Sequence, residues 1–247
     1  MSQQPASGAI KPDSAVAEMF GRIVRRYDLM NRLMTGGMDV RWRRKAVTAA
    51  RGAGDERALD VATGTGDLAI ALADGGYREV IGIDFAPEMV AAAEAKRHGR
   101  ADLTFQVGNA LNLPFPDDHF DAVTVSFGLR NMKDYQAAIT EMARVTKPGG
   151  RWICLELTPY RTPVLGTLFN WYFTRIVPTV GGWLSGDAEA YHYLPTSVAA
   201  FPDAETLLDL MRAAGLAAVE YELLGLGTVA LHVGIKPMEA SSRVVEK

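Results

Sequence analysis

The stretch that decides the fold is Ala58-Leu59-Asp60-Val61-Ala62-Thr63-Gly64-Thr65-Gly66-Asp67-Leu68. Its apolar start predicts a β-strand, its glycines predict a turn, and the residues that follow predict a helix. Glycine in such a turn lets backbone N–H groups approach a ligand closely. The same pattern is also typical of an ordinary strand–turn–helix unit in an α/β sheet, so the turn alone does not establish a ligand site.

A second strand with an acid at its end favours a bound nucleoside. It reads Val80-Ile81-Gly82-Ile83-Asp84, and an acid there can accept two hydrogen bonds from a ribose, although it could also cap the next helix. The turn lacks the third glycine of the dinucleotide fingerprint and the Gly-Lys-Ser/Thr that holds a triphosphate. An acid before the turn then suits a cationic nucleoside without phosphate, and S-adenosylmethionine is the expected cofactor. Its expected contacts in these two segments are Asp60, Thr63, Gly64, Thr65, Gly66 and Asp84.

Length and composition are those of a globular protein. The chain has 247 residues, of which 48% are hydrophobic and 22% charged, and this fits one α/β domain with additions or two small domains. The formal net charge of −3 implies no general affinity for nucleic acid, so no nucleic-acid partner is expected. The histidines and the single cysteine form no cluster with metal-ligand spacing, so no metal site is expected.

Three features predict a cytoplasmic protein. Cys154 cannot form an internal disulfide and falls in a predicted buried strand. The N-terminus has no positively charged start followed by an apolar run, so no signal peptide is expected. The longest apolar stretch, 163–184, is interrupted by Asn170, Arg175 and Pro178, and it does not predict a membrane-spanning helix.

The N-terminal fifth of the chain differs in composition from the rest. Residues 1–12 are polar and contain two prolines, and they are expected to form a disordered tail. Residues 13–50 predict two helices separated by Gly36-Gly37. Basic residues crowd the part from 22 to 45, which contains only two acids. We expect this helical segment to close over the cofactor as a lid or to face anionic lipid headgroups; a solvated helix face is the plain alternative.

Residues 51–247 alternate predicted strands with predicted helices. Such alternation indicates an α/β fold with a doubly wound, mostly parallel sheet and helices on both faces. Only Gly225-Leu226-Gly227 separates the last two strands, which predicts a C-terminal antiparallel hairpin. By fold analogy, seven strands in this order are typical of class I S-adenosylmethionine-dependent methyltransferases. We expect strands near 56–61, 79–84, 103–107, 120–126, 151–157, 217–224 and 227–235, and helices near 67–74, 87–97, 134–145 and 203–214.

The segment 158–202 interrupts this alternation and is rich in aromatic residues. It is inserted at the carboxyl end of the fifth predicted strand, beside the crevice where ligands bind in open α/β sheets. We expect this insertion to cover the substrate. The alternative is a helical excursion that only packs on the core.

Two further strand ends carry polar residues. After the third strand, the side chain of Asn109 or the backbone N–H of Ala110 could bond the adenine edge, although Asn109 could instead close a turn. Ser126 ends the fourth strand and could contact the methionine portion of the cofactor. Arg130 and Asn131 follow it and would face the methyl acceptor. The ends of parallel strands meet at one edge of a sheet, which favours a shared ligand site.

Several longer motifs are distinctive. Tyr27-Asp28-Leu29-Met30-Asn31 is followed by Thr35-Gly36-Gly37-Met38-Asp39 and Trp42, and a second run extends from Arg144 to Thr158. The shorter motifs are Leu113-Pro114-Phe115-Pro116-Asp117, Ser126 to Asn131, and Tyr191-His192-Tyr193-Leu194. Over about residues 16–236 the chain resembles the ubiquinone/menaquinone biosynthesis C-methyltransferases. The family's cofactor contacts carry over onto Thr65, Asp84, Asn109, Ala110 and Ser126.

The resemblance implies methyl transfer from S-adenosylmethionine to a ring carbon of a prenylated quinol. Its most specific form is the conversion of demethylmenaquinol to menaquinol, the last step of menaquinone biosynthesis. A benzoquinol precursor of ubiquinone, another small molecule and a sterol are the alternative acceptors. A nucleoside-binding scaffold without catalysis is the alternative outside the enzymes.

Three positions depart from the family's pattern. Asp39 stands where the family usually has histidine, which removes a titrating imidazole, so no catalytic role of that histidine carries over. Thr35 and Thr158 stand where the family usually has serine, and both keep the hydroxyl group.

Methylation of the ring requires a nucleophilic carbon. Loss of a phenolic proton supplies electron density to that carbon, so a base or a cation that stabilises the phenolate is needed. Arg130 is the first candidate for the cation, and Asn131 would orient the ring oxygen. Tyr191, His192 and Glu156 are second candidates for proton transfer, although a solvated or capping role suits His192 as well. A polyprenyl tail also implies peripheral contact with the inner face of the membrane, and a homodimer is a further expectation.

Overall fold

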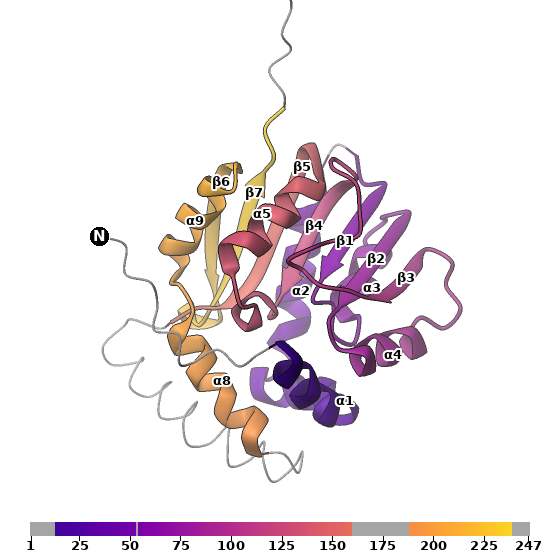
Figure 1. Ribbon diagram of the computed structural model, residues 1–247, viewed down its shortest axis with the longest axis vertical. Helices are drawn as coiled ribbons and strands as arrows, with labels where there is room; N and C mark the ends of the chain where they lie inside the picture. The colour runs from indigo at the N-terminus through magenta and orange to yellow at the C-terminus, as the bar shows by residue number, and fades with distance from the viewer. Residues whose placement is uncertain (1–12, 53, 160–187, 239–247) are drawn as a thin grey trace, which may run out of the picture.

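A seven-stranded sheet forms the centre of the structure, a computed structural model that describes residues 13–52, 54–159 and 188–238. The strands are β1 (Arg57–Val61), β2 (Glu79–Asp84), β3 (Leu103–Val107), β4 (Phe120–Ser126), β5 (Thr146–Leu157), β6 (Ala217–Leu224) and β7 (Val229–Ile235). They lie side by side in the order β3-β2-β1-β4-β5-β7-β6 (Figure 1). All neighbours are parallel except for β7, which runs antiparallel to both β5 and β6.

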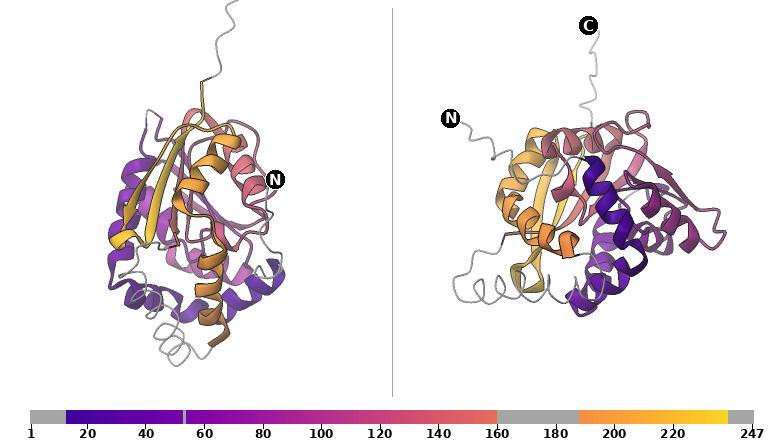
Figure 2. Two further views of the ribbon diagram at one scale, coloured as in Figure 1. Left: turned by 90° about the vertical axis from the view of Figure 1, so that its left-hand side faces the viewer. Right: turned by 60° about the horizontal axis from the view of Figure 1, so that its bottom comes forward.

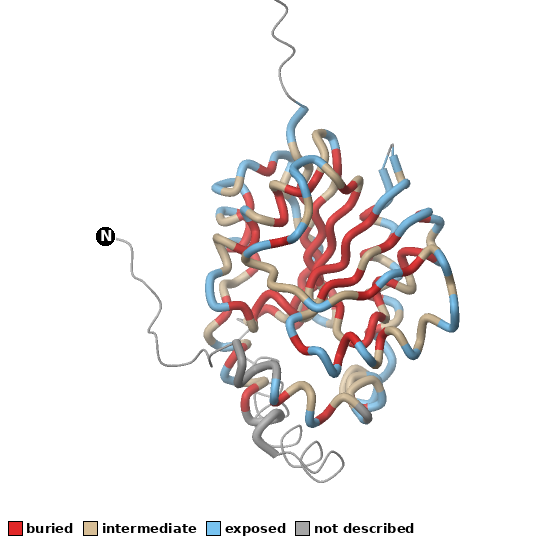
Figure 3. The backbone as a smooth tube through the Cα atoms, turned by 45° about the vertical axis from the view of Figure 1, so that its right-hand side comes forward, coloured by how far each residue is buried: buried red, intermediate tan, exposed pale blue. Residues whose placement is uncertain are grey.

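Helices cover both faces of this sheet (Figure 2). They are α2 (Met38–Ala50), α3 (Asp67–Asp74) and α4 (Pro87–Lys96) on one face, and α5 (Tyr135–Val145) and α9 (Ala204–Ala213) on the other. One core cluster includes Trp42 and Leu72, and the second includes Trp152 and Met142. The central strands are buried on both faces, as expected for apolar runs in a parallel sheet (Figure 3).

Two further helices lie at the carboxyl edge of the parallel strands, α1 (Asp13–Thr35) and α8 (Ala188–Ala200) (Figure 1). Met19, Ile23 and Met30 of α1 form a small buried cluster with Tyr193 of α8. The chain reverses from α1 into α2 through the Gly36-Gly37 turn, where φ is 58° and 78°. Glycine adopts this left-handed conformation without steric cost. The turn therefore lets α1 lie across the sheet edge at which ligands bind.

The sequence-based prediction of the fold is confirmed. The sheet is mostly parallel with a C-terminal antiparallel hairpin, and the expected helices are present. β5 begins at Thr146 rather than near 151, because Thr146 pairs with Phe120 before a bulge and Gly149 N donates to Lys236 O at 2.8 Å. The tail expected over 1–12 and most of the insertion expected over 158–202 lie outside the described residues.

Neither a membrane-crossing helix nor a metal-binding cluster occurs within the described ranges. No helix there is long and apolar enough to cross a membrane. No group of three or more His, Cys, Asp or Glu side chains is arranged there to hold a metal ion. Cys154 is buried, and burial raises the pKa of its thiol, so this cysteine is a core residue rather than a nucleophile.

Candidate active site

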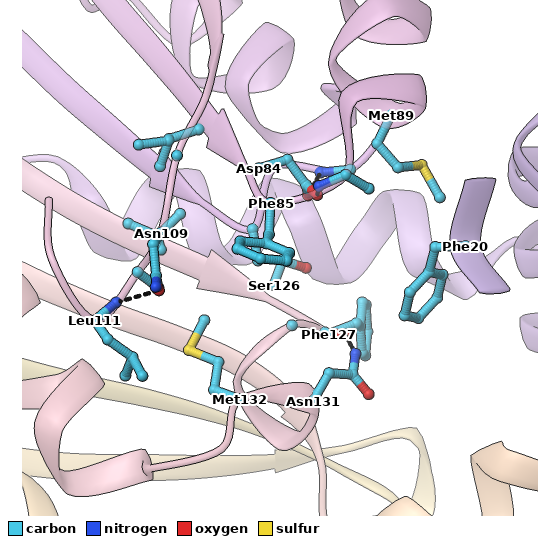
Figure 4. A pocket seen from close by; sticks show the side chains of 18 of the residues that line it. Phe20, Asp84, Phe85, Met89, Asn109, Leu111, Ser126, Phe127, Asn131 and Met132 are labelled. Atoms are coloured by element: carbon cyan, nitrogen blue, oxygen red, sulfur yellow. Dashed lines mark hydrogen bonds between the residues drawn. The ribbon is translucent and has the colours of Figure 1, made fainter. Parts of the chain in front are cut away.

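A cavity of about 830 Å³ opens at the carboxyl edge of the sheet. Its wall consists of the segments that follow β1, β2, β3 and β4, with side chains from α1, α4 and the short 3-10 helix η1 (Leu129–Asn131). Figure 4 shows side chains from these segments converging on the cavity. The position is that of a small-molecule site in an open α/β sheet.

The glycine turn after β1 forms one part of this wall. Gly64 and Gly66 have φ values of 55° and 84°, in the left-handed region. A Cβ atom at Gly66 would lie 2.8 Å from Cζ of Phe105, so packing against β3 also requires glycine there. Ala62 has a φ of 54° in spite of its Cβ atom, and such strain is typical of functional sites. Ala62 and Gly64 line the cavity, while Gly66 lies behind them.

Asp84 at the end of β2 also lines the cavity. Its Oδ2 accepts a hydrogen bond from Gly64 N at 2.8 Å, and its Oδ1 accepts one from Ala86 N at 2.9 Å. Burial raises the pKa of this carboxyl, and the hydrogen bonds from the backbone oppose that shift. The two bonds fix the carboxylate between the β1 turn and the start of α4. Asp84 therefore organises the turn and still presents lone pairs to a ligand, so the two roles expected from the sequence are compatible.

Asp60 is buried beneath the turn and does not line the cavity. Its carboxylate accepts hydrogen bonds from Thr63 Oγ1 and Thr124 Oγ1, each at 2.7 Å. Burial raises the pKa of Asp60 to about 6, although both hydroxyl bonds lower it. The geometry therefore uses Asp60 and Thr63 to join β1 to β4, and it gives no support to the direct cofactor contacts expected for them.

Replacement of Asp60 with asparagine is expected to change how the stability depends on pH. Because the pKa is higher in the folded state than in the unfolded chain, Asp60 contributes stability that is fully present below pH 4 and is lost as the pH rises through 6. The wild type should therefore gain about 2 to 3 kcal/mol relative to Asp60→Asn between pH 7 and pH 4. Urea denaturation of both proteins across this range measures the difference. A difference independent of pH would show that Asp60 titrates as an ordinary carboxyl.

Thr65 connects the turn to α1 rather than to the cavity. Its Oγ1 donates to Asp28 Oδ1 at 2.6 Å and accepts from Lys96 Nζ at 2.9 Å. Lys96 also forms ion pairs with Asp28 at 2.5 Å and with Asp67 at 2.7 Å. These contacts attach α1 to α4 and to the start of α3, so they hold α1 beside the cavity.

Asp39 extends this network to α2. It is buried, forms an ion pair with Arg43 Nη1 at 2.6 Å, and accepts a hydrogen bond from Thr35 Oγ1 at 3.0 Å. Arg43 in turn lies 3.5 Å from Asp67 Oδ2. A carboxylate at position 39 therefore anchors the turn between α1 and α2, which gives a structural reason for the departure from histidine.

The ends of β3 and β4 supply polar groups to the cavity wall. Asn109 Oδ1 accepts from Leu111 N at 2.9 Å, so this side chain closes a turn, as one alternative proposed (Figure 4). Ala110 lines the cavity beside it. Ser126 Oγ also lines the cavity and is buried without a hydrogen-bond partner among the described residues. Such a hydroxyl is ready to bond a ligand, because a buried group without a partner is costly.

Aromatic residues that the sequence analysis did not assign to the site complete the wall. Phe20 and Tyr27 of α1 both line the cavity. Phe85 and Phe127 also line it, and 44% of the surface of Phe85 is exposed. Phe127 has a φ of 55°, the same left-handed strain as in the β1 turn. The position of Phe85 directly after Asp84 is a signal that could have identified it, whereas α1 reaches the site only through the tertiary fold.

Arg130 and Glu156 form a buried ion pair beneath the cavity. Arg130 Nη1 lies 2.7 Å from Glu156 Oε1 and also donates to the carbonyl oxygen of Phe127. Neither Arg130 nor Glu156 lines the cavity, whereas Asn131 does, and Asn131 Oδ1 is buried without a partner among the described residues. Burial raises the pKa of Tyr27, and the charge of Arg130 is the largest effect that opposes it. Arg130 therefore lies close enough to Tyr27 on the cavity wall for its charge to affect that hydroxyl group.

The two remaining candidates, Tyr191 and His192, belong to α8. Their side chains lie outside the described part of the structure, so their expected roles in proton transfer stay predictions. The next residue, Tyr193, is buried against α1. α8 also packs against η1, which brings this helix close to Asn131.

Sequence comparison decides the family. The model of the ubiE/COQ5 methyltransferase family matches residues 9–236. The chain belongs to the ubiE/COQ5 methyltransferase family. It is 49% identical over 221 residues to the demethylmenaquinone methyltransferase of Thermus thermophilus, covering 89% of this chain and all of the relative. It is 43% identical over 223 residues to the ubiquinone/menaquinone biosynthesis C-methyltransferase UbiE of Desulfotalea psychrophila, covering 90% of each chain.

Solved structures share the fold of this ubiE/COQ5 family member. A Thermotoga maritima protein described as a SAM-dependent methyltransferase superimposes with a TM-score of 0.63 at 21% identity, covering 89% of this chain and 98% of the other. The [4+2]-cyclase SpnF superimposes with a TM-score of 0.70 at 19% identity, covering 95% and 100%. Because proteins with different named reactions share this fold, the likeness supports the architecture alone.

The family confirms the enzyme class expected from the sequence. This member of the ubiE/COQ5 family is an S-adenosylmethionine-dependent C-methyltransferase, and S-adenosylmethionine is its methyl donor. The residues on the cavity wall are compatible with that donor, because backbone N–H groups hold the Asp84 carboxylate on the wall and the turn after β1 carries no lysine that could bind a phosphate.

Proposed function

We propose that this enzyme methylates a ring carbon of a prenylated quinol and that its acceptor is demethylmenaquinol, which it converts to menaquinol. The observation that carries the proposal is the 49% identity to a demethylmenaquinone methyltransferase over the whole length of that relative. The cavity is consistent with an aromatic acceptor, since Phe20, Tyr27, Phe127 and Met132 line the side nearest to α1 and η1.

The chemistry assigns different tasks to the residues of the cavity. Bound S-adenosylmethionine supplies an electrophilic methyl group on a sulfonium. Asp84 would hold the ribose hydroxyls, and Ser126 Oγ would accept or donate at the methionine portion. Asn131 would orient a ring oxygen of the quinol, while Arg130 would favour the phenolate form through its charge. The ring carbon gains the methyl group and loses its hydrogen as a proton, and the sulfur leaves as neutral S-adenosylhomocysteine.

A benzoquinol precursor of ubiquinone is the second candidate acceptor. Relatives at 43% and 39% identity carry the name ubiquinone/menaquinone biosynthesis C-methyltransferase. The aromatic side chains on the cavity wall could contact either a naphthoquinol or a benzoquinol ring, because the additional fused ring of the naphthoquinol adds only apolar surface. Demethylmenaquinol remains our first choice because the relatives with 44% to 49% identity carry its name.

An assay with isotope-labelled S-adenosylmethionine and both quinols tests the proposal. We expect transfer of label to demethylmenaquinol with a kcat/KM at least tenfold above that for the benzoquinol precursor. Mass spectrometry of the product should locate the new methyl group on the quinol ring. Transfer to the benzoquinol alone would replace the acceptor, and transfer to neither quinol would contradict the proposed function.

The acceptor also bears on where the enzyme works. A polyprenyl tail partitions into a bilayer, so the proposal includes peripheral contact with the inner face of the membrane. The helical segment 13–50 would then act both as a cover of the cofactor and as the part nearest to the membrane. A homodimer and a cytoplasmic location stay predictions.

A further inference from the structure

Three exposed apolar side chains gather where α1 joins α2. Leu29 and Leu33 lie one helical turn apart near the end of α1 and are 59% and 56% exposed. Met38 opens α2 just past the Gly36-Gly37 turn and is 48% exposed. Large apolar side chains in such a cluster indicate a contact surface rather than ordinary solvent exposure.

Exposed basic side chains lie within two helical turns of these residues on the same two helices. Arg32, Arg41 and Arg44 are exposed, and none of them forms an ion pair within the described residues. We call these three arginines, with Leu29, Leu33 and Met38, the tip surface.

The acids of the same segment are turned away from the tip surface. Asp28 is paired with Lys96 of α4, and buried Asp39 is paired with Arg43. The segment 22–45 therefore exposes positive charge to solvent, whereas both of its acids are engaged in ion pairs within the protein. This local arrangement contrasts with the net charge of −3 for the whole chain.

The tip surface lies on the side of the molecule where the cavity is formed. The same helix α1 places Phe20 and Tyr27 on the cavity wall. Figure 1 shows α1 at the end of the molecule opposite to the one at which β7 ends. The helix α2 begins directly after α1, past the Gly36-Gly37 turn. Contact through the tip surface would bring the cavity close to the partner surface.

We propose that the tip surface docks the enzyme on an anionic lipid bilayer. Exposed apolar side chains with exposed arginines nearby on the same helices match an interface in which hydrocarbon lies beneath negative headgroups. The proposal rests on the proposed function, since a prenylated quinol is held in such a bilayer. It names the surface that makes the contact, and the flanking arginines select anionic over neutral lipid.

Vesicle sedimentation tests the inference. Vesicles of phosphatidylcholine alone are compared with vesicles that also contain phosphatidylglycerol. We expect the wild type to bind the anionic vesicles at least tenfold more tightly, and binding to weaken as salt is raised. Arg32→Gln/Arg41→Gln/Arg44→Gln should bind them on the order of 100-fold more weakly, at about fivefold per arginine. Leu29→Ser/Leu33→Ser/Met38→Ser should lose binding to a similar extent.

Matched controls come from the opposite edge of the sheet. Arg78 is exposed near the amino end of β2, and Met238 is 73% exposed beyond the end of β7. Arg78→Gln and Met238→Ser should bind vesicles as the wild type does. All tip variants should methylate a water-soluble short-tailed quinol at the wild-type rate, and should lose activity only on a long-tailed quinol in vesicles.

Four results would overturn the inference. These are equal binding to both kinds of vesicle, unchanged binding by the tip variants, equal losses in the controls, or a tip variant that changes the oligomeric state by light scattering without changing vesicle binding. The last result would assign the surface to a second copy of the chain. Tip-dependent vesicle binding without methylation of any quinol would support the docking surface while contradicting the proposed function.

Discussion

Replacement of Arg130 with glutamine is expected to lower kcat for quinol methylation by about 100- to 1000-fold, while the Kd for S-adenosylmethionine changes less than threefold. The fall in rate is the size observed when a preorganised electrostatic group is removed from a site where charge develops. The Kd should hold because Arg130 does not line the cavity, and its contacts are Glu156 and the carbonyl oxygen of Phe127. Initial rates of methyl transfer at saturating quinol measure kcat, and calorimetric titration with S-adenosylmethionine measures the Kd.

The variants must separate chemistry from folding, because the ion pair is buried. Alanine at position 130 would leave Glu156 without a counter-charge, at a cost of about 3 to 5 kcal/mol, although the backbone N–H groups of residues 130 and 157 would still donate to it. Glutamine also removes the positive charge but keeps a hydrogen-bond donor for Glu156, so the free energy of unfolding is measured beside kcat. Arg130→Lys keeps the charge but not the planar guanidinium group, so lysine should retain more activity than glutamine. Equal activity of the two variants would show that Arg130 only positions the η1 turn. If the Kd for S-adenosylmethionine rises by as large a factor as kcat falls, Arg130 acts in cofactor binding rather than in methyl transfer.

The fold was predictable because its signals are local. The glycine turn after β1, the acid after β2 and the short Gly225–Gly227 connection each lie within a few residues of the element that they define. Hydrophobic runs of strand length between helical segments then leave few ways to arrange the sheet. The start of β5 was misplaced by about five residues, since its extension depends on pairing with Phe120, which the local sequence does not reveal. The helix α8 was not among the expected helices either.

The site was predictable only in part, because its decisive contacts are distant in sequence. Asp60 looks like a cofactor ligand beside a glycine turn, yet one of its partners is Thr124 on a neighbouring strand. Arg130 looks like a free cation until β5 places Glu156 against it. The aromatic wall from α1 depends on contacts between α1 and α4. The ends of the strands thus identify where a site lies. Hydrogen bonds and ion pairs with residues distant in sequence determine which polar groups of the site can still bind a ligand.

Asp84→Ala is expected to raise the Kd for S-adenosylmethionine by at least about 100-fold. The carboxylate is held by Gly64 N and Ala86 N, so it is positioned before a ligand arrives. Each hydrogen bond from a ribose hydroxyl to a charged acceptor contributes about 1.5 to 3 kcal/mol, and two such bonds are lost. Asp84→Asn keeps the shape and one acceptor oxygen, so its Kd should rise less, by about tenfold. Calorimetric titration of both variants measures these changes.

Asp60→Asn is the matched control for Asp84→Asn, because the sequence predicts a cofactor contact for both aspartates. Asp60 is buried behind the turn and its carboxylate is already bonded to Thr63 and Thr124, so this variant should change the Kd less than threefold. Asp84 lies on the cavity wall, and its loss also leaves Gly64 N without its acceptor. Equal losses of affinity in Asp60→Asn and Asp84→Asn would mean that the acids act through the shape of the turn. A loss confined to Asp84 would mean that the ribose is bound by the carboxylate itself, and this is the outcome that we expect from the position of Asp84 on the cavity wall.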